Sequence, residues 1–313
     1  MARAFTFPGQ GSQAVGMGRD LSAAFAVARE VFEEVDDALK QKLSKLMFEG
    51  PESELTLTAN AQPALMAVSI AALRVLEREA KIELPKVAAY VAGHSLGEYS
   101  ALAAAGALSL SDAARLLRKR GEAMQKAVPV GEGAMAALLG LDADKAAEVA
   151  REAAQDEVCD VANDNAPGQV VVSGAKAAVE RAVEIAKAKG GRRAILLPVS
   201  APFHCALMKP AADVMEEALA AVTIAPPRVP LVANVTAQAV SDPETVRKLL
   251  VQQVTGLVRW RESVLFLKQK EVATLVELGA GKVLTGLVRR IDPELAGVSI
   301  QGPADIEAFI KTL

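Results

Sequence analysis

The sequence is poor in the residue types that bind metals or form disulfides. Its 313 residues include two histidines, two cysteines and one tryptophan. Cys159 and Cys205 are far apart in the chain and lack the spacing of zinc ligands. We therefore expect neither a disulfide framework nor a metal site, and the expected compartment is a reducing cytoplasm.

The net charge is also small, and long apolar stretches are absent from the sequence. The 35 basic and 38 acidic residues leave a net charge of −3, which gives no global attraction to nucleic acid or to an anionic membrane. No stretch reaches the roughly 18 apolar residues of a membrane span. Residues 1–13 break at Pro8-Gly9 before an apolar stretch as long as that of a signal peptide develops. We expect no nucleic-acid partner and no membrane partner.

The remaining residues alternate between strand-like and helix-like patterns. Hydrophobic residues make up 51% of the chain and aromatic residues only 4%, as in an alanine-rich α/β protein. Pro63 is expected to open one helix, and Ser111-Asp112 to cap the next. The periodicity predicts strands at 3–7, 87–92, 229–234 and 273–278, and helices at 19–48, 63–79, 95–105 and 112–127.

A second, more compact pattern occupies the middle of the chain. The elements expected there are strands at 134–139, 158–162, 169–173 and 193–199, and helices at 142–154 and 177–189. Their order, β-α-β-β-α-β, is that of the ferredoxin-like unit. The sequence therefore predicts a small subdomain at 130–199, inserted into a large α/β subdomain made of 1–129 and 200–313.

Three glycine motifs compete for a functional interpretation. Residues 9–14 fit G-x-G-x-x-A after a strand, but the acid that a dinucleotide site needs about 20 residues later would be Glu30, which lies in a predicted helix. Residues 277–286 lack the first glycine and the Ser or Thr of a phosphate loop, since Val276 and Val283 stand there. The third motif, Gly93 to Gly97, has the G-x-S-x-G pattern.

This third motif predicts a nucleophile. Ser95 stands between an apolar strand and a helix, as in the nucleophile elbow, where flanking glycines permit a tight turn. The N–H of Leu96 would point to the same space and could donate to an oxyanion. The alternative is a small residue in a tight structural turn.

A nucleophilic serine needs a base, and the chain has only two histidines. His94 is adjacent to Ser95, and neighbouring side chains in such a turn diverge, so we expect His94 to be a packed support. His204 follows the last strand of the small subdomain, where a cleft between subdomains is expected. We favour His204 as the base over a merely structural loop histidine.

One arginine is expected to point into the protein. Ala113, Leu117, Arg120 and Met124 share a helix face at spacings i, i+4, i+7 and i+11. An inward arginine is costly unless an anion pairs with it. The anion could be a substrate carboxylate held at two points, or a buried Asp or Glu in a structural ion pair.

Several motifs together resemble the bacterial malonyl-CoA:acyl-carrier-protein transacylase family. They run in the family order over nearly the whole chain and comprise FPGQGSQ (7–13), GHSLGEYSAL (93–102), NAPGQVVVSG (165–174), SAPFHCALMKPAA (200–212) and GAGKVLTGLVRRI (279–291). The resemblance implies an α/β-hydrolase-like large subdomain, a ferredoxin-like small one and a cleft between them. It further implies transfer of malonyl from coenzyme A, through a serine ester, to the phosphopantetheine thiol of acyl carrier protein, with no cofactor.

The resemblance also assigns site residues by position. It makes Ser95 the nucleophile and His204 its base, with the base oriented by a backbone carbonyl in 253–260, for which Val258 or Arg259 is expected. The remaining assignments are the amides of Gln10 and Leu96 for the oxyanion, Arg120 for the malonyl carboxylate, Gln62 and Asn165 for the pocket wall, and Phe203 for the bulky residue of malonyl-selective relatives.

Two other classes remain open. An esterase or thioesterase can have the same elbow, but such enzymes usually add an acid to the triad and do not need an inward arginine. A carrier-binding module without activity would keep the fold and form no serine ester.

Overall fold

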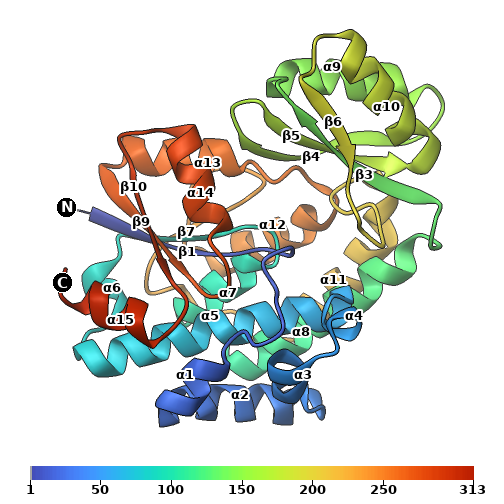
Figure 1. The fold of residues 1–313 in the computed structure, drawn as a ribbon. Coiled ribbons are helices and arrows are strands. Elements are labelled where there is room, and N and C mark those ends of the chain that lie inside the picture. Colours follow the sequence, from blue (N-terminus) through green and yellow to red (C-terminus); the bar gives the residue numbers. More distant parts are fainter. Residues whose placement is uncertain (1) are drawn as a thin grey trace.

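The computed structural model describes residues 2–313, and these residues form two separate β-sheets (Figure 1). The larger sheet has six strands in the order β10-β9-β1-β2-β7-β8, and all neighbours are parallel except β7 and β8. Its strands are β1 (Ala2–Phe7), β2 (Tyr90–Gly93), β7 (Leu231–Val232), β8 (Ala239–Val240), β9 (Val272–Leu278) and β10 (Ala296–Ile300).

Helices cover both faces of the larger sheet (Figure 1). Side chains alternate between the faces, so that Phe5 and Phe7 of β1 join one hydrophobic core and Ala4 joins the other. The helices of this part are α1 (Arg19–Ala24), α2 (Ala26–Leu39), α3 (Leu43–Glu49), α4 (Glu52–Leu55), α5 (Thr58–Ala80), α6 (Leu84–Val87), α7 (Gly97–Ala104), α8 (Leu110–Ala127), the short 3-10 helix Ala206–Met208, α11 (Lys209–Ala220), α12 (Pro243–Thr255), α13 (Trp260–Gln269), α14 (Val283–Ile291) and α15 (Pro303–Ile310).

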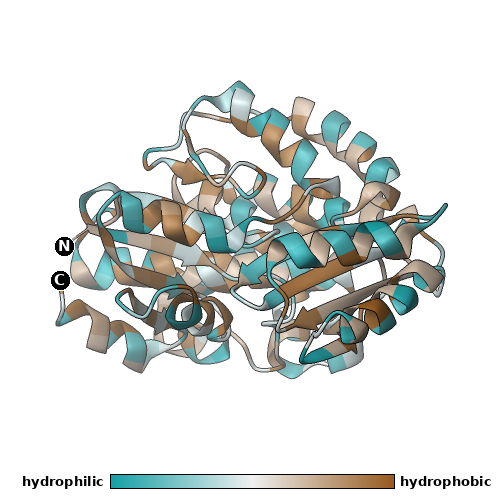
Figure 2. Ribbon diagram, turned by 90° about the horizontal axis from the view of Figure 1, so that it is seen from above, coloured by the Kyte–Doolittle hydropathy of each residue, from teal (hydrophilic) through white to brown (hydrophobic). Residues whose placement is uncertain are grey.

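The smaller sheet is antiparallel and has its own hydrophobic core. Its order is β4-β5-β3-β6, which is the strand order expected of a ferredoxin-like unit. Brown, hydrophobic residues run along these strands in Figure 2, while the helices carry both teal and brown. The elements are β3 (Gly133–Leu139), α9 (Ala143–Ala154), β4 (Cys159–Ala166), β5 (Gln169–Ala175), α10 (Lys176–Ala188) and β6 (Arg193–Leu196). The predicted fold class is confirmed, whereas the boundaries at 129/130 and 199/200 stay predictions.

Several predicted element boundaries were wrong. Helix α5 begins at Thr58 and contains Pro63, and the single helix expected at 19–48 is divided into α1, α2 and α3. The cap of α8 is Ser109, whose side chain accepts the N–H of Asp112. Helix α5 packs against α8, and tertiary packing of this kind can stabilise a helix that contains a proline.

Helix α5 also bears on the membrane prediction. It has 23 residues, and by length and mean hydropathy alone one 18-residue window could cross a membrane, although polar residues such as Gln62 and Ser69 interrupt its apolar sequence. That window is 89% buried inside the protein. The apolar character of α5 is therefore used in the core, against α2 and α8.

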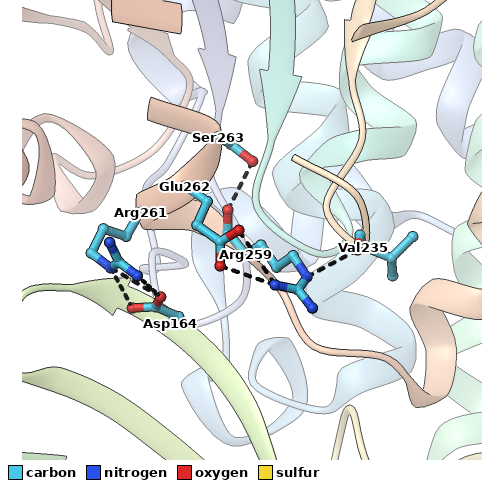
Figure 3. A network of polar contacts seen from close by, with 6 residues as sticks. All are labelled: Asp164, Val235, Arg259, Arg261, Glu262 and Ser263. Carbon is cyan, nitrogen blue, oxygen red and sulfur yellow. Dashed lines mark hydrogen bonds and ion pairs between the residues drawn. The ribbon is translucent and has the colours of Figure 1, made fainter. Parts of the chain in front are cut away.

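The smaller sheet is bonded to the segment between α12 and α13 by contacts that we call the β4 seam, made of Ala162–Asp164 and Val258–Arg261. Val258 donates its N–H to the carbonyl of Ala162 and accepts the N–H of Asp164, at 2.9 and 3.0 Å. Arg261 forms an ion pair of 2.8 Å with the buried carboxylate of Asp164 (Figure 3). Arg259, beside it, bonds to Glu262 and to the carbonyl of Val235.

Candidate active site

Ser95 occupies a sharp turn between β2 and α7. Its φ of 52° is in the left-handed region, a backbone conformation that residues other than glycine rarely adopt and that indicates strain. The flanking glycines are required by close packing. A Cβ at Gly93 would lie 1.9 Å from the backbone of Gly97, and one at Gly97 would lie 2.2 Å from the carbonyl oxygen of Phe7. The predicted elbow is therefore present in its strand-turn-helix context.

Asn234 holds this turn from the neighbouring β7 region. Its Oδ1 accepts the N–H of Ser95 at 2.8 Å, and its Nδ2 donates to the carbonyl of Gly93 at 2.7 Å. The side chain is fully buried. Two bonds from one amide to both sides of the turn offset the cost of the left-handed backbone at Ser95.

His204 lies at hydrogen-bond distance from Ser95. Its Nε2 is 2.7 Å from Ser95 Oγ, and its Nδ1 is 2.9 Å from the carbonyl oxygen of Gln253. A carbonyl can only accept, so Nδ1 carries the proton and Nε2 accepts from the hydroxyl of Ser95. This pairing can therefore remove the serine proton during a nucleophilic attack.

The carbonyl that orients His204 belongs to Gln253, and the expectation of Val258 or Arg259 was wrong. Gln253 lies in the last turn of α12, where backbone carbonyls have no partner within the helix. The carbonyls of Val258 and Arg259 are already used, the first by Asp164 and the second by Ser263. The expected segment 253–260 does contain the residue.

The surroundings of His204 keep the base neutral. Burial, and after it the positive charge of Arg120, lowers the pKa of His204 to about 3. His204 is therefore unprotonated at neutral pH, and its Nε2 lone pair faces the hydroxyl of Ser95. The positive charge next to it also means that an anion arriving at Arg120 will raise this pKa.

Arg120 points into the protein, as its helix spacing predicts, and is 1% exposed. Its Nη2 donates to Ser95 Oγ at 3.1 Å and to Gln253 Oε1 at 2.9 Å, and its Nη1 donates to Gln62 Oε1 at 2.8 Å. No carboxylate among residues 2–313 lies within 4.0 Å of this guanidinium, so the structural ion pair that was the alternative is not formed there. Burial lowers the pKa of Arg120, which favours an anionic partner.

These groups meet in a cavity of about 410 Å³, a size typical of small-molecule sites. Gln62 and Phe203 line it, as expected, together with Ser95, Arg120 and His204. The remaining wall is largely apolar and includes Met124, Met135, Leu197 and Val199.

Asn165 does not lie where it was expected. The residue of β4 that lines the cavity is Asn163, while Asn165 bonds through Oδ1 to Nε2 of His94 at 2.8 Å. Register shifts in β4 beside Asn163 and Asp164 alter which side chains face the cavity. His94 in turn packs against the ring of Trp260, with 5.8 Å between centroids, as expected of a support.

Two backbone N–H groups at the cavity have no acceptor within residues 2–313. They belong to Gln10, in the turn after β1, and to Leu96, at the start of α7. Both residues line the cavity. The dinucleotide interpretation of 9–14 thus gives way to a cavity-lining loop that holds Gln10, Gly11 and Gln13.

A competing nucleophile, Cys205, is adjacent to His204 in sequence. Its thiol donates to the carbonyl of Pro202, and burial raises its pKa to about 11. It is fully buried and does not line the cavity. Ser95 is accordingly the side chain placed for attack on a molecule in the cavity.

Comparison with known proteins gives the chain its family. A family model described as acyl transferase domain matches residues 4–293. The malonyl CoA-acyl carrier protein transacylase of Bacillus subtilis strain 168 is 47% identical over 311 residues, with 99% of this chain and 96% of that protein covered. The one of Escherichia coli strain K12 is 46% identical over 308 residues, with 98% of each covered.

The chain belongs to the malonyl CoA-acyl carrier protein transacylases of the acyl transferase family. Among solved members, the acyl-carrier-protein-S-malonyltransferase of Bartonella henselae has 57% identity and a TM-score of 0.97, and 100% of this chain and 99% of that chain are covered. A malonyl-transacylase solved with a type II PKS acyl-carrier protein has 43% identity and a TM-score of 0.96 over the whole of both chains.

Three residues of this transacylase site were not found from the sequence: Gln253, Asn234 and Glu98. Gln253 lies on the buried face of α12 with Val246 and Leu250, at the spacing that singled out Arg120. Glu98 is 1% exposed in the first turn of α7 and bonds to both Gln253 and Asn234. For Gln253 the sequence signal that could have indicated a site residue was a polar residue on the apolar face of a helix.

Proposed function

We propose that this chain transfers a malonyl group from malonyl-CoA, through an ester at Ser95, to the phosphopantetheine thiol of acyl carrier protein. The observation that carries this proposal is the position of Arg120. It places a buried cation 3.1 Å from Ser95 Oγ with only neutral partners. An acyl group with a free carboxylate would both fill the cavity and supply the missing anion.

In the first half-reaction Ser95 Oγ attacks the thioester carbonyl of malonyl-CoA. His204 Nε2 takes the hydroxyl proton, the Oγ–C bond forms, and the negative charge on the carbonyl oxygen is stabilised by the N–H groups of Gln10 and Leu96. The C–S bond then breaks, and His204 returns its proton to the departing coenzyme A thiolate. Ser95 is left as the malonyl ester.

The second half-reaction runs the same steps in reverse with another thiol. His204 takes the proton of the phosphopantetheine thiol, and the sulfur attacks the ester carbonyl. The oxyanion forms at the same two N–H groups. The Oγ–C bond breaks, and Ser95 recovers its proton from His204.

The test is a mass measurement on the intact protein after brief mixing with malonyl-CoA. One malonyl group should be added to the wild type at Ser95, and none to Ser95→Ala, which should keep its fold. Addition of a carrier protein should then remove the group as malonyl-carrier rather than as free malonate. An adduct at Cys205, no adduct on the wild type, or release to water alone would each refute the transferase mechanism.

The carrier protein is the proposed macromolecular partner, by analogy with the solved relative in complex with an acyl-carrier protein. Because the chain is itself slightly acidic, docking of an acidic carrier has to depend on local basic residues. Lys282, Arg289 and Arg290 are exposed, whereas Arg259 is bonded to Glu262. Charge reversal at the docking residues should raise the KM for the carrier, most at low salt. A cytoplasmic location stays a prediction.

A further inference from the structure

Beneath the site lies a buried carboxyl group that the proposed mechanism does not use. Glu98 follows Ser95 by three residues and is 1% exposed. Its Oε2 accepts a hydrogen bond of 2.7 Å from the side-chain amide of Gln253 and one of 3.2 Å from the backbone N–H of Asn234. Glu98 is therefore joined to two residues that hold Ser95 and His204 in place.

The amide of Gln253 is bonded on both of its ends. Its Oε1 accepts from Arg120 at 2.9 Å. Its Nε2 donates to Glu98, to the carbonyl of Ser95 at 2.9 Å and to Oδ1 of Asn234 at 3.2 Å. A glutamine amide has one acceptor end and one donor end. The acceptors on the Nε2 side therefore decide that the oxygen faces Arg120.

We propose that Glu98 is a positioning residue that sets the selectivity for malonyl, by holding the Gln253 amide with its oxygen toward Arg120. This inference rests on the proposed function. Glu98 is the nearest of the three acceptors of Nε2, and it is the only carboxyl group among them.

Without Glu98 the Gln253 amide loses the shortest hydrogen bond on its Nε2 side and keeps only those to the carbonyl of Ser95 and to Oδ1 of Asn234. Rotation that turns the NH₂ group toward Arg120 then costs less. Two donors would then oppose each other, and the guanidinium would lose one of the neutral partners that fix its plane. Binding of a carboxylate at two points depends on that plane, because the fork geometry of arginine is rigid. An acetyl group has no carboxylate and is not affected in this way.

The role of Glu98 in this arrangement is that of an acceptor and not of a charge. Burial raises the pKa of Glu98 to about 7, against the opposing effect of the hydrogen bond from Gln253. A protonated carboxyl still offers its carbonyl oxygen to the Gln253 amide. A glutamine at this position can offer the same oxygen.

The test compares kcat/KM for malonyl-CoA and acetyl-CoA in the wild type, Glu98→Leu and Glu98→Gln. Glu98→Leu should lower the ratio of malonyl to acetyl roughly tenfold, the loss expected for one hydrogen bond that orients a charged group. Glu98→Gln should keep a ratio close to that of the wild type. In a Gln253→Leu background the added effect of Glu98→Leu on this ratio should disappear.

Glu277 provides a matched control. It is also a buried glutamate at 1% exposure, but it accepts from the N–H groups of Leu284 and Thr285 and is not in the cavity wall. Glu277→Leu and Glu277→Gln should lower stability and leave the malonyl-to-acetyl ratio unchanged. A structural effect of Glu98→Leu would look like these variants, since both substrates would be affected equally.

Two results would overturn this inference without affecting the proposed function. One is a malonyl-to-acetyl ratio in Glu98→Leu that equals that of the wild type. The other is a loss of this ratio in Glu98→Gln as large as in Glu98→Leu, which would assign the effect to the charge of Glu98. If Glu98→Leu does not fold, Glu98→Asp carries the same test, because its carboxylate is withdrawn from Gln253 by one methylene, and a wild-type ratio there overturns the inference. A wild type that forms no malonyl ester overturns the proposed function, and this inference with it.

Discussion

Arg120 donates a hydrogen bond to the Oγ of Ser95 over 3.1 Å, although no carboxylate among the described residues pairs with it. The positive group and the nucleophile therefore occupy one site before any ligand arrives. An anionic acyl group would draw the guanidinium toward itself and leave Ser95 Oγ bonded to His204 alone. We therefore expect binding of a substrate carboxylate to be linked to release of the nucleophile through this single contact.

Removal of the arginine should change substrate preference more than fold. In Arg120→Ala, malonyl transfer should fall roughly 30- to several-thousand-fold relative to acetyl transfer, the equivalent of about 2–5 kcal/mol for a buried charge pair. Arg120→Lys should retain only part of the preference for malonyl, because lysine keeps the positive charge but cannot bind a carboxylate at two points. The measurement is kcat/KM for both CoA esters. An equal fall for both would identify Arg120 as a structural residue.

Substitution of the two histidines should have different effects, on the rate for His204 and on stability for His94. His204→Ala should lower the rate on the order of 10²- to 10⁴-fold, because the proton acceptor for Ser95 is lost. His94→Ala should act through stability, since His94 bonds to Asn165 and packs on Trp260. Rapid-mixing rates of ester formation, with thermal unfolding of both variants, separate the effects. Equal loss of rate in two intact folds would contradict the assignment of the base.

The pH dependence should differ between free and occupied enzyme. His204 acts when neutral, and burial together with the positive charge of Arg120 lowers its pKa to about 3. A malonyl carboxylate offsets that charge, so the pKa of His204 rises in the complex and the acid-side loss of rate appears at higher pH. With malonyl-CoA the acidic limb of the pH profile should therefore lie at higher pH for kcat, which reports the complex, than for kcat/KM, which reports the free enzyme. With acetyl-CoA the two should coincide.

Two helix glycines offer a paired test of the scaffold. A Cβ at Gly121, next to Arg120, would lie 2.6 Å from the backbone of Ala59 in α5, whereas one at Gly286 in α14 meets nothing within 4 Å. Gly121→Ala should cost about 1–3 kcal/mol and raise the KM for malonyl-CoA by displacing α8. Gly286→Ala should gain about 0.4–1 kcal/mol with unchanged kinetics. Urea unfolding and steady-state assays measure both. A neutral Gly121→Ala would mean that α8 and α5 can separate freely.

Phe203 should limit the size of the acyl group. It lines the cavity directly before His204. We expect it to occupy the space that an α-methyl group would need. Phe203→Ser should raise kcat/KM for methylmalonyl-CoA relative to malonyl-CoA. Competition between the two esters for one enzyme sample measures this directly, and an unchanged preference would remove Phe203 from the selectivity argument.

The sequence was most informative where a residue type was costly or rare. A buried arginine needs an anion, so the inward spacing of Arg120 already indicated a binding site. Gln253 has the same spacing on α12, but burying a neutral amide costs less and gave no comparable signal. The contact of its carbonyl with His204 also depends on where α12 ends, and helix ends are the least predictable feature of a sequence.

Strand irregularities limited the prediction in another way. Alternation along β4 cannot be read from residue types alone, because its register shifts at two places. Asn163 therefore took the cavity position that was assigned to Asn165. The elbow at Ser95 was predictable because its two glycines report directly on backbone crowding.

The β4 seam has a consequence for how the cavity can respond to a larger acyl group. The wall that carries Asn163 is hydrogen-bonded and ion-paired to Val258–Arg261. This segment begins three residues after the end of α12, the helix that presents Gln253 to His204. Outward movement of that wall would pull on the same helix end and draw the carbonyl away from the imidazole. An oversized acyl chain would then meet an enzyme that can still accommodate it but has lost the alignment of its base, so acyl size would be discriminated in the turnover rate and not in the affinity.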